Sequence, residues 1–289
     1  MPSPSALAAL MKPLLSLRNV TGVFVGHKEG EDELALCCLV RQKVAARKLP
    51  TSALIPRRLD WHPTSRRRRT VRTDVLESVA FQRHALPVVL GPGDSVVSPG
   101  RATVGMVLDH PRYGRVAVTA GHAFAGPTWT GTYEYAPGSE PPVFLFNAGN
   151  KPQGFQGQLL KVVVTPLADY ALVRPLNVNL CQNTYGDELA IGIPYLPSTS
   201  DVGSSLYVLC AERLLRTRFQ GAFGQIVVGR QGLISNVLLT DNVTVPGDSG
   251  SCLVGIDLRA WGLLVGSNDR YSVFMQVGTP LFLEGAHFA

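Results

Sequence analysis

Short apolar runs alternate with turn-forming residues from residue 102 to the C-terminus, and this alternation restricts the chain to a mainly β fold. Runs bounded by Gly, Pro, Asn, Asp or Ser are typical of strands, and long helical periodicity is scarce. The 29 glycines and 21 prolines of this 289-residue chain agree with many turns. The spacing predicts a β-sandwich or a pair of β-barrels. The expected strands are residues 102–108, 115–119, 143–146, 158–164, 171–173, 205–209, 222–228, 233–239, 251–254, 262–265 and 271–276.

The first 84 residues have a different pattern, in which helical and strand-like segments are mixed. The expected elements are a helix around residues 5–17, strands at 19–27, 34–40 and 73–81, and a short helical or irregular segment at 43–54. They predict a small α+β module, near the lower practical size for an independent fold. Residues 83–90 are typical of a linker, so we divide the chain into residues 1–84 and 85–289.

The net charge of +6 is concentrated in the N-terminal module. Residues 1–84 hold 15 Lys and Arg against 7 Asp and Glu, a balance of +8, whereas residues 85–289 hold 12 against 14, a balance of −2. This local basicity does not indicate a general affinity for nucleic acid. Its densest point, Arg66–Arg69, is a solvated loop, a patch for an acidic partner or nucleic acid, or an exposed cleavage site for a protease. Only Trp61 lies nearby to stack on bases, which gives an RNA-binding surface little support.

The cysteines and the apolar runs bear on where the protein resides. The number of cysteines is odd, two of them are adjacent, and no zinc-binding spacing occurs. This pattern favours free thiols in a reducing compartment. No continuous signal-peptide core is present, and no run approaches the roughly 18 apolar residues of a membrane span. We therefore expect a cytoplasmic protein with no membrane partner. The cysteines are Cys37, Cys38, Cys181, Cys210 and Cys252.

A tight turn, Gly247-Asp248-Ser249-Gly250, separates two apolar runs. Its glycines allow close backbone approach and conformations that other residues avoid. We expect this turn to be exposed, to present the Ser249 hydroxyl and to aim backbone N–H groups at the same point, as a serine nucleophile requires. Taken alone, an ordinary β-turn explains the same four residues.

Two other residues could supply the base and the carboxylate that such a nucleophile needs. His122 follows the apolar run 115–119 and is flanked by small residues, so its ring can be held from behind with one face open. Asp169 precedes an apolar run, and a carboxylate buried there needs a partner such as an imidazole N–H. A satisfied core histidine and a strand-start turn residue are the plainer alternatives for the two positions.

The three motifs together resemble those of the trypsin/chymotrypsin-like serine proteases, which are built as two perpendicular β-barrels. The motifs are Thr119–His122, Asp169–Leu172 and Gly247–Gly250, in the chain order His, Asp, Ser of that family. The resemblance covers about residues 90–289 and implies that His122 and Asp169 lie on the first barrel and Ser249 on the second. It implies Ser249 as nucleophile, His122 as general base and acid, and Asp169 as the group that fixes the imidazole tautomer. The oxyanion hole would come from the backbone of Gly247, Asp248 and Ser249, and no metal or cofactor is needed.

A narrower resemblance extends to the N-terminal module. Residues 20–28, 34–41, 55–56 and 73–75, with 92–96 and 102–107, look like a group of bacterial and plant trypsin-like proteins that includes the plant narrow-leaf proteins. The chain departs from secreted family members by carrying Ala123 after His122 and by lacking their disulfide framework. No Ile-Val-Gly-Gly-like sequence precedes the barrel. We therefore predict that Asp248 is satisfied within the chain and that no zymogen step is needed.

The resemblance also places a substrate pocket. Val243 stands six residues before Ser249, where trypsin-type members carry Asp, and Val265, Gly266 and Ser267 would form the opposite wall. A preference for apolar or small P1 side chains follows. The sequence thus predicts a serine endopeptidase acting on protein or peptide substrates. The alternative is a non-catalytic peptide-binding protein on the same fold.

Overall fold

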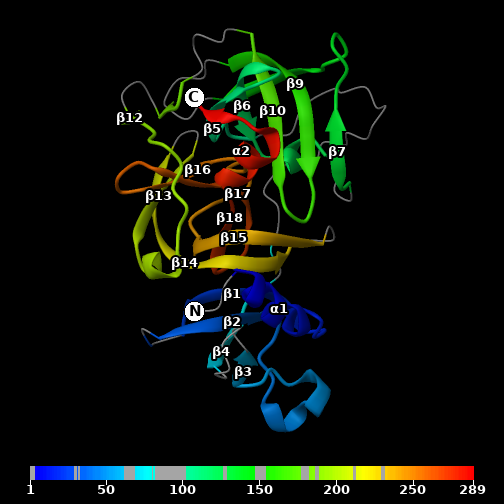
Figure 1. The fold of residues 1–289 in the computed structure, drawn as a ribbon, viewed down its shortest axis with the longest axis vertical. Coiled ribbons are helices and arrows are strands. Elements are labelled where there is room, and N and C mark those ends of the chain that lie inside the picture. Colours follow the sequence, from blue (N-terminus) through cyan, green and yellow to red (C-terminus); the bar gives the residue numbers. More distant parts are fainter. Residues whose placement is uncertain are drawn as a thin grey trace.

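The computed structural model describes most of the chain, and its regular structure is mainly β, as the sequence predicts (Figure 1). Within the described residues, this regular structure consists of three sheets, two α-helices and several short 3₁₀ helices. No helix in the described part is long and apolar enough to cross a membrane, and the cellular location stays a prediction. The described residues are 4–28, 31, 33–61, 69–79, 81, 102–125, 129–146, 154–176, 182–185, 189–210, 213–228 and 232–289.

Six strands of the C-terminal half form a closed barrel. They follow the order β13-β16-β17-β18-β15-β14, and β14 pairs back with β13. Closure therefore leaves no free sheet edge where β13 and β14 pair. The long strand β14 makes this possible because its register with β15 shifts between Phe219 and Gln225, which bends it around the barrel. The strands are β13 (Ser205–Leu209), β14 (Leu214–Val227), β15 (Leu233–Asp241), β16 (Cys252–Gly255), β17 (Ala260–Ser267) and β18 (Tyr271–Gln276).

A second sheet of seven strands forms the other part of the C-terminal region. Its order is β19-β5-β6-β10-β9-β7, with β8 also paired to β9. The central strands are apolar on both faces, and β10 is buried along nearly its whole length, which explains its unbroken Ala-Leu-Val sequence. The strands are β5 (Met106–His110), β6 (Gly114–Thr119), β7 (Gly131–Glu134), β8 (Pro142–Phe146), β9 (Gly154–Val164), β10 (Asp169–Pro175) and β19 (His287–Phe288), beside a separate pair, β11 (Thr184–Tyr185) and β12 (Leu189–Ala190).

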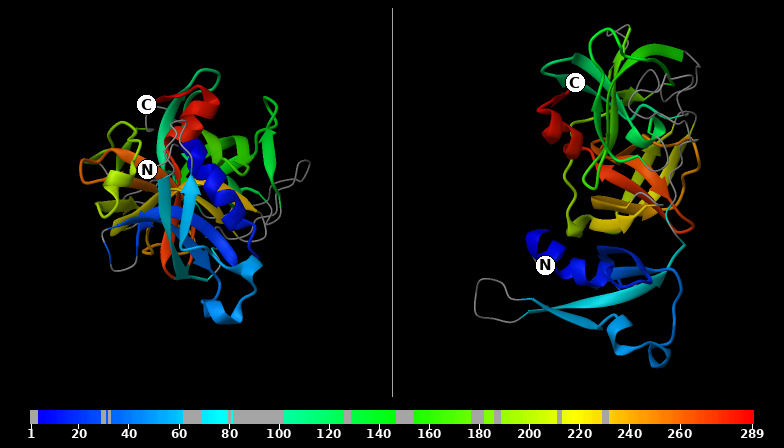
Figure 2. Two further views of the ribbon diagram at one scale, coloured as in Figure 1. Left: turned by 60° about the horizontal axis from the view of Figure 1, so that its bottom comes forward. Right: turned by 90° about the vertical axis from the view of Figure 1, so that its right-hand side faces the viewer.

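The described part of the N-terminal module contains one α-helix, two short 3₁₀ helices and four strands, and its sheet is continuous with the barrel. Strand β1 pairs with β14 of the barrel on one side and with β2 on the other, and β4 and β3 follow (Figures 1 and 2). A side chain at Gly221 would lie 2.4 Å from the Val25 carbonyl, so this pairing requires glycine. The elements are α1 (Pro4–Leu15), β1 (Val20–His27), β2 (Leu34–Val40), β3 (Arg58–Trp61) and β4 (Arg69–Glu77).

Strands β1 and β2 of this N-terminal sheet are buried on both faces. Leu7, Met11 and Leu14 recur on one face of α1 and pack on the side of the sheet that carries Val23. The neighbouring Phe24 points to the opposite side, where it joins the main core with residues of both other sheets. A shared core and a shared sheet thus join residues 4–79 to the barrel. The boundary at residue 84 stays a prediction, since residues 82–101 lie outside the described part.

Several elements differ from the expectations. The third N-terminal strand begins at Arg69 rather than residue 73, because it gains β3 as a partner. Strand β14 begins at Leu214, eight residues before the predicted run, because its exposed polar positions pair with β13. Helix α2 (Gly278–Glu284) was not predicted, nor were β3, β7, β11, β12 and β19. These short pieces have too few apolar residues to show a period.

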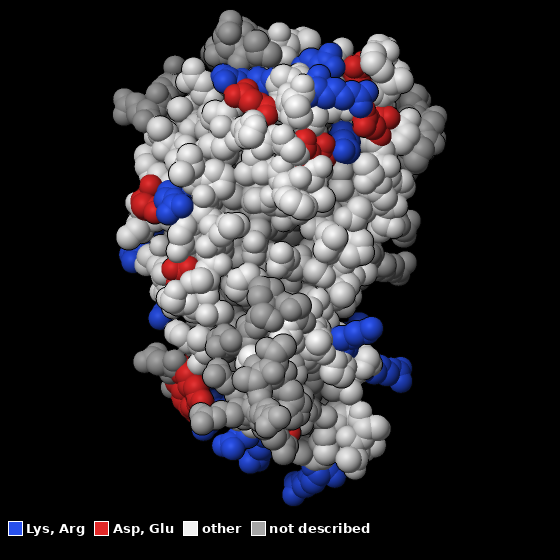
Figure 3. Space-filling view, in the orientation of Figure 1, with Lys and Arg blue, Asp and Glu red and all other residues white. Residues whose placement is uncertain are grey.

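The charged side chains on the surface are distributed as unevenly as they are along the sequence (Figure 3). In the view of Figure 3, the lower end, formed by the N-terminal module, carries more Lys and Arg than Asp and Glu, whereas the upper end mixes both signs. Residues 66–68 of the arginine run lie outside the described part, as does the side chain of Arg69. An acidic or nucleic-acid partner at this run therefore stays a prediction.

The cysteine thiols are expected to be unreactive in the folded protein. Four described cysteines are free and buried, and burial raises the pKa of the Cys38, Cys210 and Cys252 thiols to about 12. Since the thiolate is the reactive form, these three should resist iodoacetamide at pH 8. Peptide mass spectrometry of native and guanidinium-unfolded samples measures this directly. Rapid native alkylation of Cys252 would contradict the packing around the Ser249 turn.

Candidate active site

His122 lies in a short 3₁₀ turn directly after β6 and is almost fully buried. Its Nδ1 is 2.9 Å from Asp169 Oδ2, and its backbone N–H donates to Asp169 Oδ1 at 2.8 Å. Because a carboxylate only accepts hydrogen bonds, Nδ1 carries the proton and Nε2 keeps its lone pair. The carboxylate thus fixes both the position of the ring and its tautomer.

Asp169 is the first residue of β10, and its side chain is fully buried. Strand β10 pairs with β6 so that Ala171 faces Thr119, and this register brings Asp169 beside the turn that holds His122. The carboxylate thus lies in the interior with the imidazole of His122 as its partner.

Ser249 lies between β15 and β16, and its Oγ is 3.0 Å from His122 Nε2. The three side chains therefore form one continuous line of hydrogen bonds, from Asp169 through His122 to Ser249. This arrangement can pass the Ser249 proton to the imidazole. Ser249 is fully buried, however, whereas the sequence predicts an exposed turn. The turn packs against the segment just before β5, where the Ser249 carbonyl accepts the Thr103 N–H at 2.8 Å.

The backbone around Ser249 offers two open donors, not three. The N–H of Asp248 already donates to the Val245 carbonyl at 3.1 Å. The N–H groups of Gly247 and Ser249 have no hydrogen-bond acceptor among the described residues. Gly247 has φ +100°, a backbone conformation that favours glycine. The expected oxyanion hole is thus limited to Gly247 and Ser249.

Asp248 has partners within the chain, as the sequence predicts. Its Oδ2 accepts hydrogen bonds from Arg213 at 2.6 Å and from the Val245 N–H at 2.9 Å. Arg213 stands 35 residues before Asp248, just before β14, and no local pattern in the sequence marks it. The loop is therefore held in its folded form by an ion pair that the described chain itself supplies.

The four predicted pocket residues have different surroundings. Val265 is fully buried in the main hydrophobic core, while Gly266 and Ser267 end strand β17. Val243 is half-buried, and its N–H donates to Ser272 Oγ at 3.4 Å. The buried hydroxyl of Ser272, which the sequence did not single out, therefore lies beside Val243. The substrate pocket and its P1 preference stay predictions.

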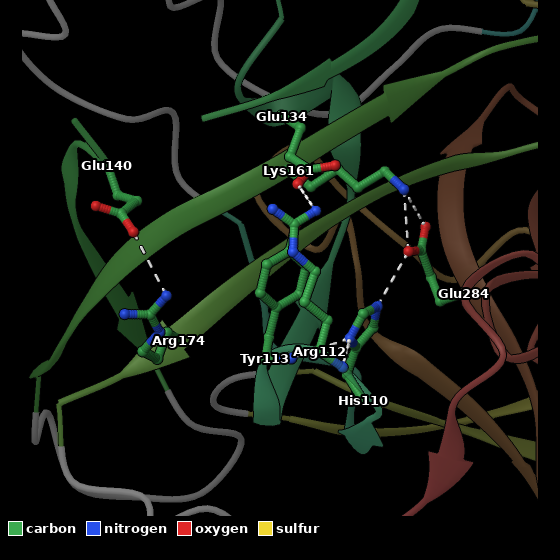
Figure 4. Close-up of polar contacts among 8 residues, drawn as sticks. All are labelled: His110, Arg112, Tyr113, Glu134, Glu140, Lys161, Arg174 and Glu284. Atoms are coloured by element: carbon green, nitrogen blue, oxygen red, sulfur yellow. Dashed lines mark hydrogen bonds and ion pairs between the residues drawn. The ribbon is translucent and has the colours of Figure 1, made fainter. Parts of the chain in front are cut away.

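A buried polar cluster lies behind Asp169. The neighbouring Tyr170 donates its hydroxyl to Glu284 at the end of α2. Lys161 also donates to this carboxylate, at 2.8 and 3.0 Å (Figure 4). His110 Nδ1 accepts two backbone N–H groups, so its Nε2–H faces Glu284 at 3.2 Å. Helix α2 is thereby fastened to β5, β9 and β10.

These contacts determine the charge of the Glu284 carboxyl group. Burial alone would raise the pKa of Glu284, but the hydrogen bonds from Lys161, Tyr170 and His110, with the charge of Lys161, hold it below its usual value. The carboxylate therefore stabilises the fold above the ordinary glutamate pKa of about 4.3, and this contribution is lost as pH falls through the lower, folded value.

Replacing Glu284 tests this account. Glu284→Gln is expected to lower the free energy of unfolding by about 1–3 kcal/mol near pH 7, because it removes a charged acceptor from buried donors. The difference from wild type should shrink as pH falls toward 3. Urea unfolding across this range measures it. Glu134→Gln, which breaks the exposed ion pair with Arg112 shown in Figure 4, is the control and should cost less than about 1 kcal/mol. Equal stability of the two variants would contradict the prediction.

Gly250 provides a second test. It has φ +88°, and a Cβ there would lie 2.3 Å from the Thr103 carbonyl oxygen and 2.6 Å from Thr119 Oγ1. Gly138 has a matching φ of +86° with nothing within 4 Å. Gly138→Ala should cost about 1–2 kcal/mol from backbone strain alone. Gly250→Ala should cost about 3 kcal/mol or more, because the backbone at Thr103 must move. Chemical unfolding measures both, and equal costs would refute the close approach.

No family model matches the chain, and no curated protein matches it. Among solved structures, it is similar to Cellulomonas bogoriensis chymotrypsin (15% identity, 64% of this chain and 89% of that chain, TM-score 0.43). It is also similar to Thermobifida fusca protease A (15%, 64% and 90%, TM-score 0.45) and to Nocardiopsis protease (18%, 66% and 98%, TM-score 0.44).

Likenesses this distant say nothing of activity. The chain's own features agree with the predicted fold: a mainly β structure, a closed six-stranded barrel, and the second sheet that carries His122 and Asp169. Its fold is thus similar to that of the chymotrypsin-like serine proteases.

Proposed function

We propose that the chain is a serine endopeptidase that hydrolyses peptide bonds through an acyl-enzyme. The proposal depends on one observation, the line of hydrogen bonds from Asp169 through His122 to Ser249, at 2.9 and 3.0 Å. The three residues come from segments 47 and 80 positions apart. Burial supports the proposal further, because a carboxylate, an imidazole and a hydroxyl interact more strongly when water is excluded.

Each group has a distinct part in the proposed reaction. Ser249 Oγ attacks the scissile carbonyl carbon while its proton passes to His122 Nε2, and Asp169 stabilises the resulting imidazolium. The amides of Gly247 and Ser249 donate to the carbonyl oxygen as it becomes negative. The imidazolium protonates the leaving amine, the C–N bond breaks, and the acyl group remains on Ser249. Water deprotonated by His122 then hydrolyses this ester and restores the hydroxyl.

The substrates in this proposal are proteins or peptides with apolar or small P1 side chains. Val243 replaces the carboxylate that a basic P1 residue would need, and its backbone N–H donates to the uncharged hydroxyl of Ser272. Cleavage restricted to bonds after Arg or Lys in a peptide library would overturn this part.

A non-catalytic peptide-binding protein is the second candidate, and one observation favours it. Ser249 is fully buried, so a substrate reaches its hydroxyl only if the surrounding residues move. A small electrophile that reacts with activated serine separates the two candidates, because it reports directly whether the hydroxyl is accessible and nucleophilic.

The expected result is stoichiometric labelling of Ser249 by a fluorophosphonate, located by peptide mass spectrometry. Ser249→Ala and His122→Ala should abolish labelling and lower peptide hydrolysis by about 10⁴–10⁶-fold, and Asp169→Asn by about 10⁴-fold. Ser251→Ala, a buried serine two residues away, is the matched control and should label normally. Absence of labelling in pure, folded wild-type protein would favour the peptide-binding candidate.

A further inference from the structure

Asn268, in the hairpin between β17 and β18, makes four hydrogen bonds with its buried side chain. Its Nδ2 donates to Ser78 Oγ at 2.5 Å and to the Val79 carbonyl at 3.0 Å. Its Oδ1 accepts the N–H groups of Arg270 and Tyr271 at 2.9 and 2.8 Å. An asparagine amide has two donor hydrogens and two acceptor lone pairs, so every one is used. Asn268 directly follows Ser267, a residue of the predicted pocket.

Asn242, which directly precedes Val243, joins this network from the other wall of the pocket. Its Nδ2 donates to the Asn268 carbonyl at 2.6 Å. Its Oδ1 accepts the Ser272 hydroxyl and the Thr244 N–H, both at 3.2 Å. The two walls of the predicted pocket are thus tied to each other through Asn242.

Ser272 completes the connection to the loop that carries Ser249. Its hydroxyl is fully buried and, while donating to Asn242, accepts from the Thr244 hydroxyl at 2.9 Å and the Val243 N–H at 3.4 Å. Thr244 stands five residues before Ser249. A small displacement of Asn268 can therefore be transmitted through hydrogen bonds to Val243 and Thr244.

The other end of the network is held by the N-terminal module. Ser78 follows β4, and its N–H donates to the Val40 carbonyl at 2.9 Å. The side chain of Glu77 accepts the Lys43 N–H at 2.9 Å, and its carbonyl accepts Arg270 Nη1 at 3.0 Å. The segment from Glu77 to Val79 is therefore fastened to the module on one side and to the β17–β18 hairpin on the other.

We propose that Asn268 and Asn242 are positioning residues through which the N-terminal module sets the geometry of the substrate pocket. The module contacts the network at Ser78 and Val79, which accept hydrogen bonds from the Asn268 side chain. Asn242 bonds the Asn268 carbonyl and the Thr244 N–H, and so links Asn268 to the segment of Val243 and Thr244. This inference rests on the proposed function for its effect on substrates, but the coupling itself is a property of the fold. It gives the N-terminal module a role in substrate binding.

The test replaces Asn268 with Asp, which keeps the shape but turns two donors into an acceptor facing the Val79 carbonyl. Asn183→Asp is the matched control, because Asn183 is equally buried at 8% exposure and bonds Val107 and Ala289, away from the pocket. Asn268→Asp should raise KM for a peptide substrate about tenfold more than it slows fluorophosphonate labelling. Asn183→Asp should change neither the KM nor the labelling rate, although both variants lose stability.

Amide hydrogen exchange supplies a readout that does not depend on activity. Exchange at Val243 and Thr244 should accelerate about tenfold in Asn268→Asp and stay unchanged in Asn183→Asp. Ser78→Ala removes one partner from the module side and should act in the same direction, which keeps the test valid if Asn268→Asp does not fold. Unchanged exchange in the Asn268 and Ser78 variants would overturn the coupling. Absent labelling of the wild-type protein would instead refute the proposed function, and exchange would still decide the coupling.

Discussion

The buried carboxylate of Asp169 is the constraint on which the rest of the site depends. A carboxylate without exposure is tolerated only when hydrogen bonds replace its lost water. His122 supplies two of them, from its backbone N–H and from Nδ1–H. These bonds fix the turn after β6 and leave Nε2 facing Ser249. The N–H of Asp169 points in turn to Met275 Sδ on β18 at 3.3 Å, so this residue stands where the second sheet meets the barrel.

Backbone contacts bring Ser249 to this pair from the barrel side. Thr103 donates its N–H to the Ser249 carbonyl, and its own carbonyl accepts the Thr119 hydroxyl at 2.7 Å. One residue thus links the nucleophile turn to the strand that precedes His122. The 3.0 Å between Ser249 Oγ and His122 Nε2 is therefore set by main-chain packing around Gly250, which leaves the side chains little freedom to drift apart.

The sequence predicts what depends on local pattern and misses what depends on distant pairing. The three motif residues could be expected from residue type and neighbours, whereas the closed β architecture and the internal partner for Asp248 were expected from the family resemblance. Arg213 and Asn268 could not, since polar residues in loops carry no period and their partners are tens of residues away. The burial of Ser249 was missed for the same reason: exposure is decided by what packs on a turn, and a Gly-Asp-Ser-Gly sequence does not reveal that.

The N-terminal module and the barrel are joined by two kinds of contact with different consequences. Apolar contacts, such as the ring of Phe24 against Tyr271 at 5.8 Å, hold the parts together but tolerate small sliding movements. The Asn268 amide does not, because four saturated hydrogen bonds admit one geometry. Without the module, the edge of β14 that pairs with β1 would be open and the Asn268 donors would face no partner. Residues 4–79 are therefore joined to the barrel both by a shared sheet and by this buried amide.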